Sequence, residues 1–379
     1  AISTLSGVVD IAISCKTLTE DIVDDIYCQL QNEAYAFILV FFSPLYVGTK
    51  FSTELRRKFN NTPVYGCSSA GELTSEGLSE GAIVAVGFRA SDFGVVCCLI
   101  ENLDQFTITN GQAQVQKSFE VFQANRSVCK PHCLALMLVD GLCYCEERLV
   151  SAVNSGIKDI PLIGGSAGDG LQFSKTSIVY DGEIKENAAI LLLIESRPQL
   201  HIFKSDSFLP SPVKFVVTRA DPEKRIVYEL NAMPAATAYA TALGVNETDL
   251  NPLSFASHPL SVCFGGDHYV RSIQDVNADG SFRFYCAIDE GIVFTLSEIG
   301  DMVQGIEETM EEIQQNIGKP QMVLGFDCIL RRLMYEINQS KGQVNQLFKD
   351  HRVIGFNTYG EQIHGMHLNQ TFSGIAIGR

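Results

Sequence analysis

Three segments of this chain place small polar residues beside glycines and directly ahead of a carboxylate. VIGFNTYGE (residues 353–361) and VYGCSSAGE (residues 64–72) share one spacing, and LIGGSAGD (residues 162–169) is a copy one residue shorter. Backbone N–H groups at glycine turns, with nearby hydroxyl, amide and carboxylate groups, can hold an anionic or zwitterionic ligand. The candidate ligand-binding residues in these segments are Gly66, Cys67, Ser68, Ser69, Gly71, Glu72, Gly164, Gly165, Asn357, Thr358, Gly360 and Glu361.

A carboxylate ligand would also need a planar cation that donates two parallel hydrogen bonds, as a guanidinium group does. Our candidates for this role are Arg271 and Arg331. Cys328, His367 and Asn369 extend the C-terminal group of candidates. The alternative is structural: the glycines permit close packing between repeated units, and the carboxylates bond to neighbouring backbone. The residue types alone leave both interpretations open.

A cysteine-dependent enzyme is a further interpretation. Cys67 lies among glycines, and Cys328 lies at a predicted strand-to-helix junction, where a helix N-terminus lowers the pKa of a thiol. Asp327 beside Cys328 has the opposite effect. The sequence GCSSAG is not the GxSxG elbow of hydrolases, and neither a P-loop nor a GxGxxG turn stands between a strand and a helix. We therefore expect that the protein is not an enzyme.

Four other cysteines, Cys129, Cys133, Cys143 and Cys145, flank the apolar run 134–140, which is predicted to be a strand. At ~3.3 Å per residue the ends of that strand lie roughly 20–25 Å apart. A single zinc or iron–sulfur site using all four is therefore not expected.

The elements around the glycine segments recur in one order: an apolar strand, a helix, a second strand, the glycine turn and a third strand. The interval from Phe41 to Gly66 equals that from Val139 to Gly164, and the interval from Phe326 to Gly355 is slightly longer. This repetition predicts internal duplication in an α/β or α+β fold with mixed sheets. The predicted strands are 36–43, 63–65, 82–88, 93–99, 134–140, 161–163, 177–180, 188–194, 322–326, 353–354 and 372–377, and the helices are 51–59, 111–122, 146–153 and 329–348.

Length and turn signals predict two domains. At 379 residues the chain exceeds the size at which one core usually stops growing. Residues 1–35 are predicted to be a helical N-terminal segment, and a change of character near residue 220 divides the remainder into 36–220 and 221–379. In the second part we expect strands at 260–264, 269–273 and 282–288 and an amphipathic helix over 297–317, whose outer face is rich in glutamate.

Composition excludes several classes of protein. The net charge of −16 argues against non-specific binding to nucleic acid and against docking on an anionic membrane. No apolar run approaches the ~18 residues of a membrane-spanning helix. No basic stretch followed by an apolar one marks a secretory signal. The twelve cysteines are scattered and mostly lie in apolar runs, as reduced thiols do. We expect a cytoplasmic protein without nucleic-acid partners or membrane insertion.

Four stretches resemble the FIST family: FILVFFSPLY with PVYGCSSAGEL, IPLIGGSAGDGLQF, MVLGFDCILRRL, and RVIGFNTYGEQIHGMHLNQTFSGIAIG. The resemblance covers about 36–220 with an N-terminal and 221–363 with a C-terminal FIST domain. It implies a cytoplasmic sensory module of signal transduction that binds a small ligand, such as an amino acid. The chain is also similar to the NosP branch in being FIST-only. That similarity implies a haem-based sensor of nitric oxide that regulates a separate histidine kinase. It is also compatible with a homo-oligomer.

Haem would need an axial ligand, usually His or Cys, and a large apolar pocket. His258, ahead of the apolar run 260–264, and His268, after a Gly-Gly-Asp turn, are the alternative candidates. There is no CxxCH motif, which excludes covalent attachment of a c-type haem. The alternative to haem is a sensor of a small amino-acid-like metabolite.

Overall fold

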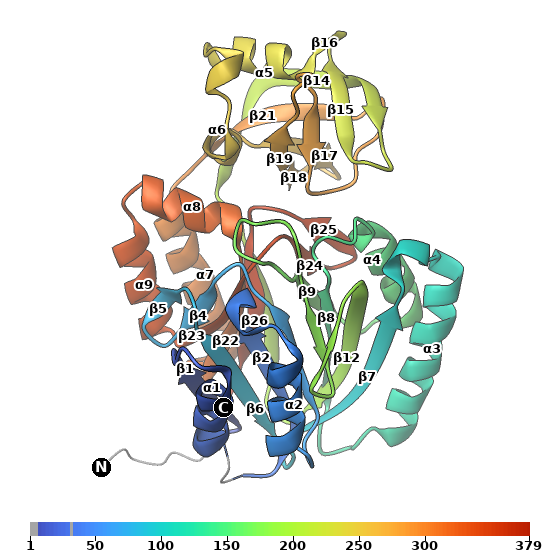
Figure 1. Cartoon of the computed structure of the whole chain (residues 1–379), viewed down its shortest axis with the longest axis vertical. Coiled ribbons are helices and arrows are strands. Elements are labelled where there is room, and N and C mark those ends of the chain that lie inside the picture. Colours follow the sequence, from blue (N-terminus) through green and yellow to red (C-terminus); the bar gives the residue numbers. More distant parts are fainter. Residues whose placement is uncertain (1–6, 31–32) are drawn as a thin grey trace.

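The computed structural model describes residues 7–30 and 33–379, which form a large α/β body with a smaller, β-rich domain above it (Figure 1). The predicted helical segment 1–35 lies partly outside these residues, at 1–6 and 31–32. Within them it begins with a strand, Val9–Ser14, and only then forms a helix, Thr19–Leu30. A helix alone was wrong for residues 9–14, because they pair with the strand at 83–89.

Three successive copies of one unit make up the body. The first contains β1 (Val9–Ser14), α1 (Thr19–Leu30), β2 (Tyr35–Phe42), α2 (Thr49–Lys58), β3 (Val64–Ser68), β4 (Glu72–Thr74), β5 (Gly77–Ser79) and β6 (Ile83–Arg89). The second contains β7 (Phe93–Glu101), α3 (Ile108–Asn125), β8 (His132–Val139), α4 (Glu146–Gly156), β9 (Leu162–Ser166), β10 (Ile178–Tyr180), β11 (Glu183–Lys185) and β12 (Ala188–Ser196). The third contains β13 (Leu200–Ser205), α7 (Met302–Ile317), β22 (Met322–Cys328), α8 (Ile329–Ile337), α9 (Lys341–Asp350), β23 (Val353–Thr358), β24 (Glu361–Ile363), β25 (Met366–Leu368) and β26 (Phe372–Ile377).

Each copy builds one six-stranded sheet, and the three sheets share one strand order. They run β1-β6-β2-β3-β10-β11, β7-β12-β8-β9-β24-β25 and β13-β26-β22-β23-β4-β5. The third and fourth strands of each sheet are parallel. The last two strands of each sheet are a hairpin from another copy. The predicted internal duplication is confirmed, and the copies interlock by exchanging hairpins.

The apolar faces of the three sheets meet inside the body. Phe41 of β2, Leu136 of β8 and Phe356 of β23 all belong to this central core, and the rings of Phe41 and Phe356 stack with centroids 4.6 Å apart. Outer helices cover the opposite faces: α1 and α2 on the first sheet, α3 and α4 on the second, and α7 to α9 on the third. The strands are therefore buried on both faces, which explains why they were recognisable as continuous apolar runs.

The small domain is inserted into the third copy, between β13 and α7. It contains β14 (Phe208–Asp221), β15 (Ile226–Leu230), β16 (Met233–Pro234), α5 (Ala235–Leu243), α6 (Pro252–Ser257), β17 (Leu260–Phe264), β18 (Asp267–Arg271), β19 (Ile273–Val276), β20 (Phe282–Phe284) and β21 (Val293–Ile299). The domain boundary that we predicted near residue 220 falls within β14. The segment 302–377, predicted to lie with 221–299, instead completes the body.

Two predicted helices have different bounds. The helix expected over 297–317 begins at Met302, because β21 continues to Ile299 and Asp301 caps the helix by accepting a hydrogen bond from the Gln304 N–H. The helix expected over 329–348 is broken into α8 and α9 where Gln339 takes a left-handed φ of 54°. Throughout the described residues, every helix lacks either the length or the apolar character that a membrane span requires.

Candidate functional site

The three glycine segments meet at the end of the body that faces the small domain; we call residues 69–72, 166–172 and 357–361 the crown. Backbone hydrogen bonds join them. The Ala70 N–H donates to the Asn357 carbonyl at 2.9 Å, and the Tyr359 N–H donates to the Ser166 carbonyl at 3.1 Å. The Gly168 N–H donates to the Ser68 carbonyl at 3.1 Å. The fold thus brings together segments that are far apart in the sequence.

The leading glycines of the segments lie inside strands, pressed against the parallel partner strand. A Cβ on Gly66 would lie 1.8 Å from the Val40 carbonyl oxygen, and one on Gly355 would lie 1.8 Å from that of Gly325. Gly360 is close to a side chain instead, since its Cβ would lie 2.4 Å from Cε1 of His367. These glycines therefore allow neighbouring strands and core side chains to pack closely.

Two buried glutamates occupy equivalent cages in the first and third copies. Ser69 donates to Oε1 of Glu72, and Thr358 donates to Oε1 of Glu361. The other oxygen accepts an N–H ten residues further along: that of Ala82 at 3.0 Å for Glu72, and that of Thr371 at 3.3 Å for Glu361. Burial raises the pKa of Glu72 to about 7 and the pKa of Glu361 to about 8. The sequence repeat thus encodes one carboxyl cage twice.

Arg331 and Cys328 lie in the core beneath the crown. The Nε of Arg331 lies 3.0 Å from Oδ1 of Asp327 and 3.1 Å from the Tyr335 hydroxyl. Burial raises the pKa of Asp327 to about 6. Burial also holds the pKa of the Cys328 and Cys67 thiols well above the usual value, which disfavours the thiolate that a nucleophile requires.

A cavity of about 380 Å³ opens between the crown and α8, and three of the predicted residues line it: Ser69, Gly71 and Glu72. Its main cation is Arg332. One guanidinium nitrogen, Nη1, donates to Oδ1 of Asn357 and to the Ser79 carbonyl, both at 3.0 Å. A Cβ on Gly71 would lie 1.8 Å from that nitrogen, so Gly71 makes room for the guanidinium.

The second nitrogen of Arg332, Nη2, faces an acidic partner at the surface. It lies 2.8 Å from Oε1 of Glu80, and the Arg332 side chain is 4% exposed whereas that of Glu80 is 78% exposed. Glu336 also lines the cavity, along with Asp169. The cavity therefore presents a buried cation, an exposed carboxylate paired with it and further carboxylates in its lining.

Sequence reasoning missed Arg332, Glu80, Asp169 and Glu336. Helical spacing places Ile329, Arg332 and Glu336 on one face of α8, but it does not indicate which face meets the cavity. All three line the cavity. The identical neighbour Arg331 was chosen instead, and only the rotation of α8 against the body separates the two arginines.

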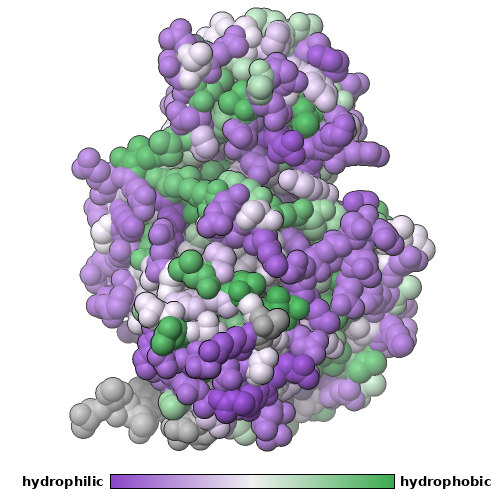
Figure 2. All heavy atoms as spheres, viewed as in Figure 1, coloured by the Kyte–Doolittle hydropathy of each residue, from purple (hydrophilic) through white to green (hydrophobic). Residues whose placement is uncertain are grey.

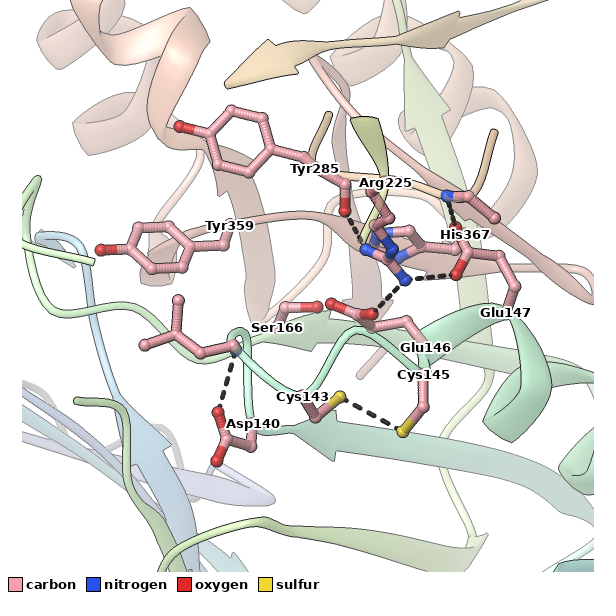
Figure 3. Close-up of polar contacts among 12 residues, drawn as sticks. Asp140, Cys143, Cys145, Glu146, Glu147, Ser166, Arg225, Tyr285, Tyr359 and His367 are labelled. Atoms are coloured by element: carbon pink, nitrogen blue, oxygen red, sulfur yellow. Dashed lines mark hydrogen bonds and ion pairs between the residues drawn. The ribbon is translucent and has the colours of Figure 1, made fainter. Parts of the chain in front are cut away.

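Arg271, His367 and Asn369 lie at a second polar layer, the junction between the body and the small domain. Figure 3 shows His367 at this junction. Its centre is Arg225 of the small domain, whose Nη2 lies 2.8 Å from Oε2 of Glu146 and 2.6 Å from Oε2 of Glu147. Burial alone would lower the pKa of Arg225, but the two glutamates raise it above the usual value. The junction is therefore held by a buried, charged clamp.

Several polar atoms at this junction are buried without a hydrogen-bond partner among the described residues. They include Nε2 of His367, Oγ of Ser272 and Nη1 of Arg271. The His367 Nδ1 lies 3.0 Å from Nε2 of Gln362. Figure 2 shows a waist at this level, with hydrophobic side chains gathered along one side of it. The junction thus combines a strong clamp with unsatisfied polar groups, which water can bridge.

The haem candidates lie in the small domain. His268 has its Nδ1 3.1 Å from the Ser261 hydroxyl. His258 caps the C-terminal end of α6, and its buried Nδ1 has no hydrogen-bond partner within the described part of the chain. Neither histidine lines the crown cavity or the cavity of about 650 Å³ at the opposite end of the body. A haem ligated by His258 or His268 therefore stays a prediction.

A larger cavity, of about 650 Å³, lies at the opposite end of the body, where β8 and β9 begin. Its polar lining includes Arg126, His132, Lys158, His201 and His364. We favour the crown cavity as the ligand site because ligands of α/β folds bind beyond the carboxyl ends of parallel strands, and the crown is that end in all three copies.

Comparison with known proteins identifies two family models that together match most of the chain. The FIST N domain model matches residues 36–233 and the FIST C domain model matches residues 235–364. An uncharacterised protein of Methanocaldococcus jannaschii, MJ1623, is 22% identical over 249 residues, which cover 57% of this chain and 48% of that protein. The match therefore spans about half the length of this relative.

Proposed function

Because this chain belongs to the FIST family, whose domains are sensory ligand-binding domains of signal transduction, we propose that it senses a small zwitterionic metabolite of amino-acid type. The proposed site is the crown cavity of about 380 Å³. That volume is within the range of about 300–1,000 Å³ that small-molecule sites occupy. The observation that carries the proposal is the pair of Arg332 and Glu80.

The pair provides a replaceable anion on a fixed cation. Arg332 is held on one side by Asn357 and Ser79, whereas its Nη2 contacts the 78% exposed Glu80. Because Glu80 is 78% exposed, water can hydrate its carboxylate when it moves away from Arg332. A ligand carboxylate can take its place and accept a charge-assisted hydrogen bond in a desolvated setting.

The remaining carboxylates suit the amino group of the same ligand. Asp169 is occupied, since it accepts the N–H groups of Phe173, Ser174 and Lys175 at 2.8–2.9 Å. Glu336 is free to turn, because its side chain is 48% exposed and pairs with a surface lysine. Both oxygens of Glu72 also accept hydrogen bonds, from Ser69 and from the Ala82 N–H. We therefore assign the ammonium to Glu336.

Binding can be communicated to the small domain through aromatic rings. Tyr359 donates to Asp169, which belongs to the cavity wall. The rings of Phe173 and Tyr359 lie 4.8 Å apart, and Phe173 lies 5.8 Å from Tyr285 of the small domain. A shift of the 169–172 loop would therefore move the small domain. As the receiver of the signal we propose a histidine kinase on a separate chain, the output that resemblance to the NosP branch implies.

A thermal-shift screen of free amino acids and their amides tests this proposal. A ligand at a hundredfold excess over Kd stabilises the folded state by about 2.7 kcal/mol, which a melting curve resolves readily. We expect the shift to require both the carboxylate and the amino group. A parallel sample is incubated with haem and then with nitric oxide. A Soret band that appears in the wild type and disappears in His258→Ala or His268→Ala would show that the ligand is haem and not a metabolite.

A further inference from the structure

Two cysteines at the edge of the junction are held with their sulfur atoms in contact. Cys143 and Cys145 have Sγ atoms 3.4 Å apart (Figure 3). Tyr144 between them has φ 53°, a left-handed conformation that non-glycine residues rarely adopt. The turn that contains them is anchored by Asp140, which accepts the N–H of Leu142 at 2.9 Å. This bend in the backbone places the side chains of Cys143 and Cys145 next to each other.

The two thiols differ in access. Cys145 is 1% exposed and immediately precedes α4, whereas Cys143 is partly exposed beside the exposed Tyr144. A small reagent can therefore reach Cys143 first, and Cys145 lies next to it as a resolving thiol.

We propose that Cys143 and Cys145 form a reversible disulfide by exchange with a small-molecule disulfide of the glutathione type. The Cys143 thiolate attacks one sulfur of the reagent, its S–S bond breaks and one reagent thiolate leaves. The Cys145 thiolate then attacks the Cys143 sulfur of the mixed disulfide and expels the second reagent thiolate. The protein loses two electrons and two protons, and the reagent gains both as two free thiols.

The disulfide would act on the clamp that joins the two domains. Closing it shortens the sulfur separation from 3.4 Å to about 2.0 Å, and we expect part of this movement at Cys145, the residue that immediately precedes α4. The next two residues, Glu146 and Glu147, are the acidic partners of Arg225. Glu147 also accepts the Ala287 N–H of the small domain at 2.6 Å. Oxidation therefore loosens contacts between α4 and the small domain.

Burial raises the pKa of the Cys143 thiol well above its usual value, with hydrogen bonding to Cys145 and the charge of Glu146 adding to the effect. The thiolate is correspondingly scarce at neutral pH. We therefore expect the exchange to be slow at neutral pH and to quicken as the pH rises.

The test is mass spectrometry of the full chain, incubated with oxidised glutathione, quenched with an alkylating reagent and digested. We expect the peptide with Cys143 and Cys145 to lose about 2 Da, from two hydrogens, and to regain them with dithiothreitol. The exposed Cys15, Cys28, Cys129 and Cys263 report that the reagent reached the protein. An unmodified pair in a sample where these carry glutathione would overturn the proposal.

Variants and hydrogen exchange complete the test. Cys145→Ser should trap the glutathione adduct on Cys143, and Cys129→Ser, at an exposed cysteine, should leave disulfide formation unchanged. In the oxidised wild type we expect the Ala287 amide to exchange faster, and in Cys143→Ser we expect no change on oxidation. A disulfide that leaves this exchange rate unaltered would overturn the link to the junction.

Discussion

Nη2 of Arg332 lies 2.8 Å from Oε1 of Glu80, and the two side chains are 4% and 78% exposed, respectively. A buried guanidinium with an exposed, movable partner differs from Arg331, whose partners Asp327 and Tyr335 are themselves buried. The two adjacent arginines therefore have separate roles in our account: Arg331 stabilises the core of the third copy, and Arg332 binds the ligand.

Glu80→Gln should strengthen ligand binding, because it removes the carboxylate that competes for Nη2 of Arg332. Loss of a competing contact worth about 1 kcal/mol corresponds to a Kd lowered by about fivefold. Isothermal titration of wild type and variant with the screened ligand measures this. Weaker binding by Glu80→Gln would show that Glu80 contacts the ligand directly.

Arg331→Ala should destabilise the fold by about 3–5 kcal/mol, because Asp327 would remain buried without its cationic partner. Urea denaturation followed by circular dichroism gives the change in free energy of unfolding. Arg57→Ala is the control, since Arg57 is an exposed residue paired with Glu54 on α2. Equal stability of the two variants would contradict a structural role for Arg331.

Glu361→Gln should flatten the dependence of stability on pH. The pKa of Glu361 is raised from 4.5 to about 8 in the folded protein, so between these values the folded state binds more protons than the unfolded state. The stability that the protonated carboxyl contributes is present below pH 4.5 and lost as the pH rises through about 8. The slope attributable to one such group is at most about 1.4 kcal/mol per pH unit.

Unfolding curves at several pH values for wild type and Glu361→Gln measure that slope. Glu307→Gln, on the outer face of α7, is the control because it removes an exposed carboxylate. A wild type and a Glu361→Gln variant with the same pH profile would contradict the raised pKa.

Gly360→Ala should lower stability by about 1–3 kcal/mol, because the added Cβ overlaps the ring of His367. Gly360 has no positive φ in this structure, so crowding is the cause and not a turn that only glycine can adopt. Gly342→Ala on α9 is the matched control: its Cβ meets nothing within 4 Å, and alanine favours helix by up to about 1 kcal/mol. Thermal melting of both variants should show shifts of opposite sign.

The repeated elements of the body could be predicted from the sequence, since buried parallel strands such as β8 read as continuous apolar runs. The exchange of hairpins could not. Strand β4 pairs with β23, nearly three hundred residues further along the chain, and no local pattern specifies that pairing. Strand β14 was missed because most of its residues are at least partly exposed and no apolar run marks it.

Only part of the candidate site could be predicted, again because local sequence patterns do not specify how distant elements pack. Ser69, Gly71 and Glu72 line the cavity because their segment ends a parallel strand, which local pattern indicates. Arg331 and Arg332 are adjacent, and about 100° of helix rotation decides which one faces the cavity. Packing of α8 on the body sets that rotation, and the sequence carries no local signal for it.

The most direct test of the ligand site is isothermal titration of Arg332→Ala and Arg332→Lys with the amino acid that most stabilises the wild type. Our account predicts that Arg332→Ala loses binding by tenfold or more, which corresponds to about 1.4 kcal/mol, and that Arg332→Lys, which keeps the charge without the fork, lies between. Arg57→Ala should bind as wild type does. An Arg332→Ala variant that stays folded and binds with wild-type affinity would contradict the crown cavity as the sensory site.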